Sequence, residues 1–169
     1  VLRLQQPCGW YQNLRQRLYH PRSYSRWRLF YQQVQCVLAT HGDEELALHL
    51  MAYAISTELD QIYFASLANT QKVANMRTNP NVTCLWDNRT GHSDDHTAGL
   101  AMSGFGQAHE LTGEPALTAQ RLLLQRNTTL KPLLLEPTLV LFTLQIDRYQ
   151  WVEGYTRVVI YKPEKSTLN

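Results

Sequence analysis

Short apolar runs, separated by turn residues, dominate the chain after residue 34. Residues 35–40, 61–66 and 81–87 are such runs, with the length and bounding polar residues that are typical of strands. Residues 46–56 form a longer and nearly continuous apolar run, and the His-Gly-Asp sequence before that run predicts a hairpin. The first half of the chain is therefore expected to be rich in antiparallel strands.

The same pattern returns in the second half, over residues 98–110, 139–147 and 151–160. Gly104 and Gly106 interrupt the first of these segments, which predicts a bulge or a sharp bend in that strand. With few helices between them, these segments favour a mainly β fold over a doubly wound sheet. We predict a six- to seven-stranded antiparallel β-barrel with helical decorations.

Four segments have helical spacing instead. Residues 10–19 and 25–34 are separated by a His-Pro sequence whose proline, Pro21, is expected to interrupt them. Residues 70–77 form a short helix before an Asn-Pro break, and residues 114–126, with a proline near their start, show the clearest helical pattern.

Length and composition fit one domain with a substantial core, because the chain has 169 residues of which 44% are hydrophobic. We expect an N-terminal helical extension over residues 1–34, a barrel domain over 35–162 and a tail over 163–169. The net charge of +2 is small and the basic residues are dispersed, so nucleic acid is not an expected partner.

The cysteines and the hydropathy pattern bear on location. Cys8, Cys36 and Cys84 are odd in number, and the last two lie in apolar strand-like runs where a free thiol behaves as a small hydrophobic group. A reducing cytoplasm is therefore expected. No stretch approaches the roughly 20 apolar residues of a membrane span, so no membrane association is expected.

No metal site is expected either. His92 and His96 have a spacing that would suit a metal ion only on a helix. Gly91 and Ser93 instead indicate a loop, so this pair does not form a convincing set of ligands.

The segment from Tyr63 to Trp86 carries the most informative chemistry, because it places a strand, a polar turn, a short helix and a second strand in succession. Asn69 or Thr70 can cap the helix, and Lys72 lies in its first turn. A lysine in a first turn opposes the helix dipole unless an anion lies beside it. The segment therefore predicts a phosphate-binding turn.

The spacing of Lys72, Met76, the pair Asn79-Pro80 and a strand over 82–86 resembles the pyridoxamine 5'-phosphate oxidase family of FMN-binding split barrels. The resemblance implies FMN as cofactor, a homodimer with FMN at the subunit interface, and a flavin-dependent oxidoreductase that acts on a small molecule. The flavin would supply the chemistry, so no catalytic residue is assigned.

The resemblance also implies which residues contact the cofactor. Two of them depart from the family, because His49 and Gln71 stand where arginine is common, and Asn75 or Arg89 is expected to make up the missing contact. The implied cofactor-binding residues are His49, Leu50, Met51, Phe64, Ala65, Ser66, Thr70, Gln71, Lys72, Asn88, Arg89 and Trp151.

Three alternatives remain open at this point. The segments 146–149 and 152–155 are similar to strands of haem-utilisation split-barrel proteins, which raises haem as a rival ligand. Related barrels also use a deazaflavin, and the same barrel can bind FMN without turnover. Pyridoxamine phosphate oxidation itself is not expected, because Arg157 is followed by Val-Val-Ile and not by the family's substrate-binding histidine.

Overall fold

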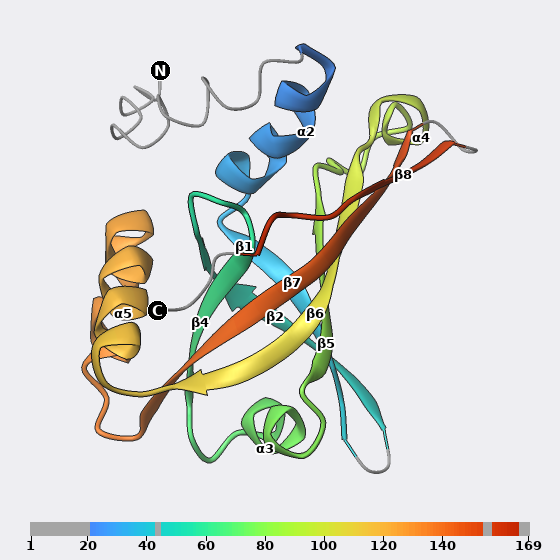
Figure 1. Cartoon of the computed structure of the whole chain (residues 1–169). Helices are drawn as coiled ribbons and strands as arrows, with labels where there is room; N and C mark the ends of the chain where they lie inside the picture. The colour runs from blue at the N-terminus through green and yellow to red at the C-terminus, as the bar shows by residue number, and fades with distance from the viewer. Residues whose placement is uncertain (1–20, 43–44, 154–156, 166–169) are drawn as a thin grey trace.

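The computed structural model describes residues 21–42, 45–153 and 157–165 (Figure 1). The helix expected over residues 10–19 lies outside them. The strands form one antiparallel sheet in the order β2-β1-β5-β6-β7-β4-β3, and β8 pairs with β7. The strands are β1 (Gln35–His41), β2 (Leu46–Ala52), β3 (Ala54–Ile55), β4 (Gln61–Leu67), β5 (Asn81–Asp87), β6 (Ala101–Leu111), β7 (Leu139–Glu153) and β8 (Arg157–Tyr161).

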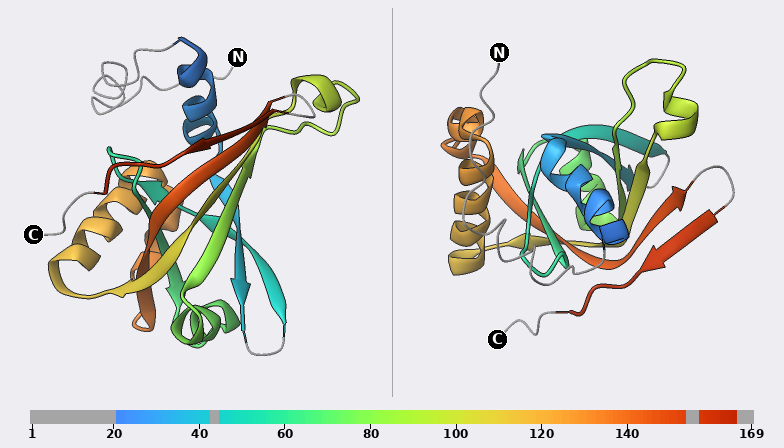
Figure 2. Two further views of the ribbon diagram at one scale, coloured as in Figure 1. Left: turned by 45° about the vertical axis from the view of Figure 1, so that its right-hand side comes forward. Right: turned by 90° about the horizontal axis from the view of Figure 1, so that it is seen from above.

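The sheet curls into a half-barrel, as predicted, and helices close or cover it. Seen from above, α2 lies over the opening of the curl, and α3 lies at the opposite end (Figures 1 and 2). No helix among the described residues is long and apolar enough to cross a membrane. The helices are α2 (Pro21–Gln32), α3 (Gln71–Thr78), α4 (Asp95–Ala98), α5 (Gly113–Arg126) and α6 (Lys131–Leu134), with a 3₁₀ turn η1 (Thr128–Leu130).

Several predicted boundaries differ from the structure. Helix α2 begins at Pro21 and not at residue 25, because a proline is tolerated in a first helical turn. The apolar run over 46–56 is divided at Tyr53, and β7 is one long strand where two were expected. The strands do not pair simply in sequence order, because β1 pairs with β5 and β4 pairs with β7.

The bulge predicted for the glycine-containing strand is confirmed. The register of β6 against β7 shifts between Phe105 and Gly106. A Cβ atom on Gly106 would lie 1.9 Å from the carbonyl oxygen of Gln145, so only glycine allows the two backbones to approach this closely. The bulge increases the curvature that brings the ends of the sheet toward each other.

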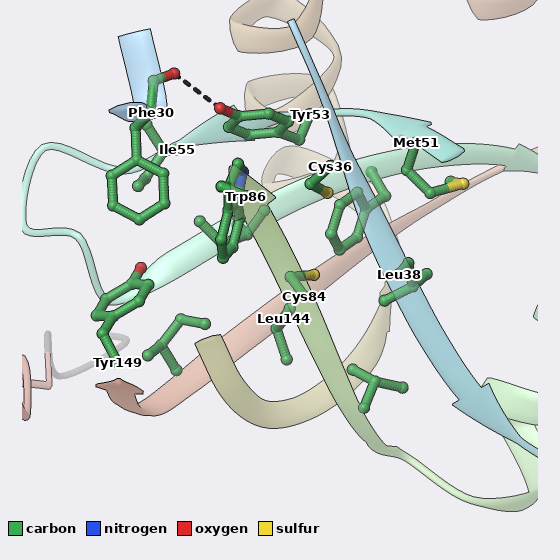
Figure 3. Close-up of a cluster of buried hydrophobic side chains, with 14 of the residues drawn as sticks. Phe30, Cys36, Leu38, Met51, Tyr53, Ile55, Cys84, Trp86, Leu144 and Tyr149 are labelled. Atoms are coloured by element: carbon green, nitrogen blue, oxygen red, sulfur yellow. Dashed lines mark hydrogen bonds between the residues drawn. The ribbon is translucent and has the colours of Figure 1, made fainter. Parts of the chain in front are cut away.

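Alternating residues of each strand fill the interior of the curl. Cys36 and Leu38 from β1 point inward and meet Cys84 and Trp86 from β5 (Figure 3). Both cysteines are free and buried, as expected. A second cluster lies outside the curl, where α5 buries Leu123 against β4 and α6.

Aromatic side chains seal the end of the barrel beneath α2. Trp27 of α2 contacts the rings of Tyr149 and Trp151 edge-on, with centroids 5.5 and 5.8 Å away. Phe30 packs against Trp86 in the same manner, at 4.7 Å. Such edge-to-face pairs add to the area that the rings bury.

The last carbonyl groups of α2 are bound by two side chains from elsewhere in the chain. The Tyr53 hydroxyl donates to the carbonyl oxygens of Phe30, at 2.7 Å, and Gln33, at 3.1 Å (Figure 3). The Arg126 guanidinium donates to the same two oxygens and lies 4.4 Å from the centroid of the Tyr53 ring. Because helix C-termini leave carbonyls unpaired, this pair anchors α2 to the barrel.

Replacing this anchor should destabilise the fold. Arg126→Ala leaves two carbonyls without their charged donor, and we expect the free energy of unfolding to fall by about 2 kcal/mol. Arg121→Ala is the matched control, because Arg121 lies on the same helix and its nearest carboxylate, on Glu114, is 3.7 Å away and exposed. The control should change the free energy by at most about 0.5 kcal/mol in chemical denaturation. Equal losses in the two variants would contradict the anchoring role.

Candidate functional site

Helix α3 closes the end of the barrel opposite α2 and leaves donors at its start unpaired. Val73 and Met76 are buried in the core, so the helix is fixed in place by its apolar side. The N-cap residue Thr70 makes no side-chain capping bond, and its carbonyl oxygen accepts from the N–H groups of Val73 and Ala74. Within the described chain, the N–H groups of the first two helical residues therefore have no acceptor. This helix start can receive an anion.

Two hydroxyl groups lie beside this helix start. The Ser66 hydroxyl, at the end of β4, is 3.1 Å from the Thr70 hydroxyl, which donates to the carbonyl oxygen of Leu67 at 2.9 Å. Since the Thr70 proton is used in that bond, Ser66 is the donor to Thr70. Both hydroxyl groups are thus already paired, and they must rotate to donate to a ligand.

Polar side chains from β1, β2 and α3 meet next to these hydroxyls. Thr40 is fully buried, and its hydroxyl oxygen lies 3.0 Å from the His49 Nε2 atom. The side-chain amide of Asn75 donates to the same oxygen at 3.0 Å. A buried polar cluster at one end of an otherwise apolar barrel is costly unless its groups are paired, and here they pair with one another.

Lys72 provides the positive charge of this end of the barrel. Its side chain is partly buried, and within the described chain it forms no ion pair. Burial lowers the pKa of the His49 imidazole, and the Lys72 charge lowers that pKa further. The histidine is therefore neutral at pH 7, and Lys72 is the cation that an anion would meet.

A carboxylate from the hairpin between β1 and β2 lies close to the helix start. The Gln71 side-chain amide donates to a Glu45 carboxylate oxygen at 3.2 Å. The contact turns the Gln71 side chain toward the hairpin, at the position where the resemblance led us to expect a cofactor contact. The negative charge of Glu45 repels an anion and therefore weakens the binding of an anion to Lys72.

The sheet is split beside this cluster. Among the described residues, strand β2 pairs only with β1, so one of its edges has no neighbour there. Within the same part of the chain, strand β4 pairs with β3 only at Ile62 and Tyr63, which leaves the next residues, up to Leu67, paired only with β7. Unpaired backbone groups of two strands therefore flank α3, and they can donate to and accept from a planar polar ligand.

The structure brings some of the predicted site residues together and separates others. His49, Ser66, Thr70, Gln71 and Lys72 surround the start of α3. Four others lie in different surroundings on β2 and β4. Met51 and Phe64 are buried in the core, Ala65 belongs to the cluster beneath α5, and Leu50 is exposed on the outer face of the sheet.

The remaining predicted residues lie far from α3 within one chain. Asn88 and Arg89 follow the end of β5 that is distant from α3, roughly 20 Å away along that strand. The Asn88 side chain accepts from the N–H of Leu100, and Arg89 forms an ion pair with Asp87 at 3.0 Å. Trp151 is buried against α2. These three can reach a ligand at α3 only from another copy of the chain or after rearrangement.

Two residues of the site were not predicted from the sequence. Thr40 carried only a weak signal, a polar residue at an inward-facing position of a strand. Glu45 carried none, because its contact with Gln71 joins segments 26 residues apart.

A second surface of interest is the outer face of the sheet. The pairing registers align Leu50, Val37, Leu85, Ser103, Gln150 and Ile160 in one row across six strands. A neighbouring row contains Leu48, Ala39, Thr83, Phe105 and Arg148. The only charge in these two rows is the Arg148 guanidinium, which lies 4.0 Å from the centroid of the Phe105 ring.

Apolar side chains predominate on this outer face, and those at both of its margins are exposed to solvent. Leu46, Leu48 and Leu50 of β2 are 66%, 67% and 70% exposed, and Val158 and Ile160 of β8 are more than half exposed. A contiguous apolar surface of this kind is characteristic of a protein contact.

Comparison with solved structures identifies the fold. A haem-binding protein from Mycobacterium smegmatis superposes with a TM-score of 0.71 at 16% identity, covering 85% of this chain and 59% of its own. General Stress Protein 26 from Bacillus anthracis superposes with a TM-score of 0.64 at 17% identity, covering 85% of this chain and 99% of its own. A protein from Listeria innocua described as a putative pyridoxamine 5'-phosphate oxidase superposes with a TM-score of 0.59 at 15% identity, covering 76% of this chain and 96% of its own.

The fold is therefore the split barrel of proteins similar to pyridoxamine 5'-phosphate oxidase, as the sequence resemblance implied. No protein-family profile matches the sequence, and no curated protein matches it. The likeness at this level of identity is one of fold. This chain spans 59% of the length of the M. smegmatis protein.

The electrostatic coupling between Lys72 and His49 gives a test that needs no ligand. Lys72→Gln removes a positive charge that disfavours the imidazolium, so the pKa of His49 should rise toward its ordinary value of 6.5. We expect an NMR titration of the histidine ring to show this rise. Lys131→Gln, on α6, is the control and should leave the His49 titration unchanged. An unchanged titration in Lys72→Gln would show that the two groups are not coupled.

Proposed function

We propose that this protein binds FMN through its phosphate group at the start of α3 and acts as a homodimeric flavin-dependent oxidoreductase on a small molecule. The observation that carries the proposal is the state of Lys72, which is partly buried beside unpaired backbone N–H groups and has no ion-pair partner in the described chain. A cation kept in this position is stabilised when an anion binds.

The residues around α3 fit the phosphate group of FMN. Lys72 provides a charge-assisted hydrogen bond, and the first N–H groups of the helix provide further donors. His49 lies next to them, and the hydroxyls of Ser66 and Thr70 can rotate toward a phosphate oxygen. The unpaired edges of β2 and β4 supply backbone groups for the polar rim of a flavin ring. The set contains one cation, which predicts moderate and not extreme affinity.

The outer face of the sheet supports a homodimer as the form that binds FMN. Apolar side chains predominate in its two aligned rows, and the margins contain the exposed leucines of β2 and the valine and isoleucine of β8. A second copy would bury these side chains without leaving an unpaired charge, apart from Arg148. Arg89 and Asn88 lie far from α3 within one chain. In the proposed dimer, the partner's Arg89 and the partner's Asn88 would be the copies that contact the cofactor.

When FMN is bound, it supplies hydride and electron transfer, and this chain positions it. Lys72 and the start of α3 hold the phosphate end, and the strand edges orient the ring. The core beneath the split is filled with Met51, Phe64 and other apolar side chains, which exclude water from one side of the site. This arrangement leaves the opposite side for a substrate of small size.

Haem is the second candidate, because one of the superposed proteins, from M. smegmatis, is described as haem-binding. A deazaflavin cofactor, or FMN held without turnover, would use the same barrel. Visible absorption of the purified protein, followed by identification of any released compound, distinguishes these possibilities. A flavin spectrum that a reduced nicotinamide bleaches supports the oxidoreductase, whereas a Soret band supports haem.

The phosphate-binding role of Lys72 can be tested directly. Lys72→Gln removes the cation of the site and should weaken FMN binding by about ten- to a hundredfold. Quenching of flavin fluorescence on titration into the apoprotein provides the measurement. Lys131→Gln is the control and should bind FMN as the unaltered chain does. Equal affinity in the two variants would place the phosphate elsewhere.

The outer face can be tested through the oligomeric state. Leu48→Glu places a charge between the exposed Leu46 and Leu50 at the β2 margin of this face and should weaken dimerisation by more than about a hundredfold. Leu135→Glu is the matched control, because Leu135 is 71% exposed but lies after α6, away from this face. Sedimentation velocity should show a monomer for the first variant and a dimer for the second. If both variants remain dimers, this face is not the interface.

A further inference from the structure

The protonation state of His49 is determined by its hydrogen-bond partners. Thr40 is fully buried, and its hydroxyl has two polar neighbours, the amide group of Asn75 and the Nε2 atom of His49. The Asn75 amide nitrogen can only donate. The Thr40 hydroxyl accepts that bond and must donate its own proton, and the available acceptor is His49 Nε2. The proton of a neutral imidazole is then on Nδ1.

The opposite direction of bonding is unfavourable. If Nε2 carried the proton, it would donate to the Thr40 oxygen, and the Thr40 proton would have no acceptor in a buried position. An unpaired buried donor is costly, so the first arrangement is favoured.

The position of Gly42 agrees with this assignment of the Asn75 amide. The Asn75 oxygen is packed against Gly42, where a Cβ atom would lie only 2.7 Å from it. Rotating the amide would place its oxygen beside the Thr40 hydroxyl and reverse the direction of that bond, and it would turn the N–H donors toward the Cα of Gly42, which is not an acceptor. Asn75 is thus the first donor of a hydrogen-bond series, in which Asn75 of α3 donates to Thr40 of β1 and Thr40 donates to His49 of β2.

We propose that Asn75 and Thr40 are positioning residues that hold His49 as a neutral donor with its proton on Nδ1, available to a phosphate oxygen beside Lys72. This inference rests on the proposed function for the identity of the ligand, but the hydrogen-bond series itself exists without a ligand. It explains how a histidine can serve at the position where the sequence resemblance implied an arginine. The phosphate would meet one charged donor and one neutral donor.

The charges around His49 agree with a neutral ring at pH 7. Lys72 on α3 disfavours the imidazolium, and burial acts in the same direction, so the pKa of His49 lies below its ordinary value. Glu45, at the hairpin, is paired with Gln71 and offsets part of the Lys72 charge. His41 points to the other face of β1, and the neighbouring residues of β4, Phe64 and Ser66, are uncharged. Asp43 and Glu44 lie outside the described residues.

The experiment measures the ¹⁵N resonances of the histidine rings in the apoprotein at pH 7.5. For His49 we expect a protonated Nδ1 and an unprotonated Nε2. Thr40→Val keeps the shape of the side chain but removes the donor, so His49 should acquire a substantial population with the proton on Nε2, the form that free imidazoles favour. Thr143→Val, another buried threonine, on β7, is the control and should leave the His49 ring unchanged.

A second variant reverses the series. Asn75→Asp replaces the donor by an acceptor, so Thr40 should donate to the new carboxylate and accept from His49 Nε2. The His49 proton should move to Nε2, and the new negative charge should raise the pKa of the ring. Should this variant fail to fold, Thr40→Val alone decides the question.

The outcomes separate this inference from the proposed function. An Nε2-protonated or charged His49 in the unaltered apoprotein, or an unchanged ring in Thr40→Val, would overturn the inference. Adding inorganic phosphate and then FMN to the apoprotein tests the ligand. A shift of the Nδ1 resonance on addition supports the contact with phosphate. If the tautomer is as predicted but neither phosphate nor FMN shifts the Nδ1 resonance, the donation to phosphate and the proposed FMN site are both overturned. The assignment of the tautomer in the apoprotein then stands by itself.

Discussion

The rest of the structure depends on one geometric constraint: a sheet that curls without closing has two open ends and one open seam. Each end must be covered so that the core stays dry. At one end, aromatic side chains beneath α2 give an apolar closure, and Tyr53 and Arg126 pair the carbonyls of the covering helix. At the other end, the eight-residue helix α3 provides two buried apolar side chains and a polar first turn. The unequal closures concentrate polar groups at one place.

The polar end of the barrel can bind a ligand because only some of its polar groups are hydrogen-bonded to one another. Thr40, Asn75 and His49 form a paired series, whereas Lys72 and the first N–H groups of α3 have no protein acceptor in the described chain. The unpaired edge of β2 runs alongside. Elsewhere in the barrel such groups would be costly. Their presence together beside the seam of the sheet is the basis for proposing a ligand with a negative end and a planar polar body.

The extent to which the sequence anticipates this structure follows from the range of the interactions involved. Strand positions and the bulge at Gly106 could be predicted because short apolar runs and glycine requirements are local. Lys72 could be recognised because a cation in a first helical turn is locally unfavourable. The bonds from Arg126 to the end of α2, and from Asn75 to Thr40, join distant segments and leave no local pattern. The place of Trp151 also depends on a distant segment, since this aromatic residue, expected at the cofactor, is buried against Trp27 of α2 within one chain.

The central claim is that the start of α3 recognises a phosphate group, and comparing FMN with riboflavin tests it most directly. The two compounds share the flavin ring and differ in the phosphate, so their affinities for the same apoprotein isolate the contribution of this end of the barrel. Calorimetric titration should give an affinity for FMN at least about a hundredfold higher than for riboflavin, the value of two or more charge-assisted hydrogen bonds. Equal affinities, or no binding of either compound, would contradict the account.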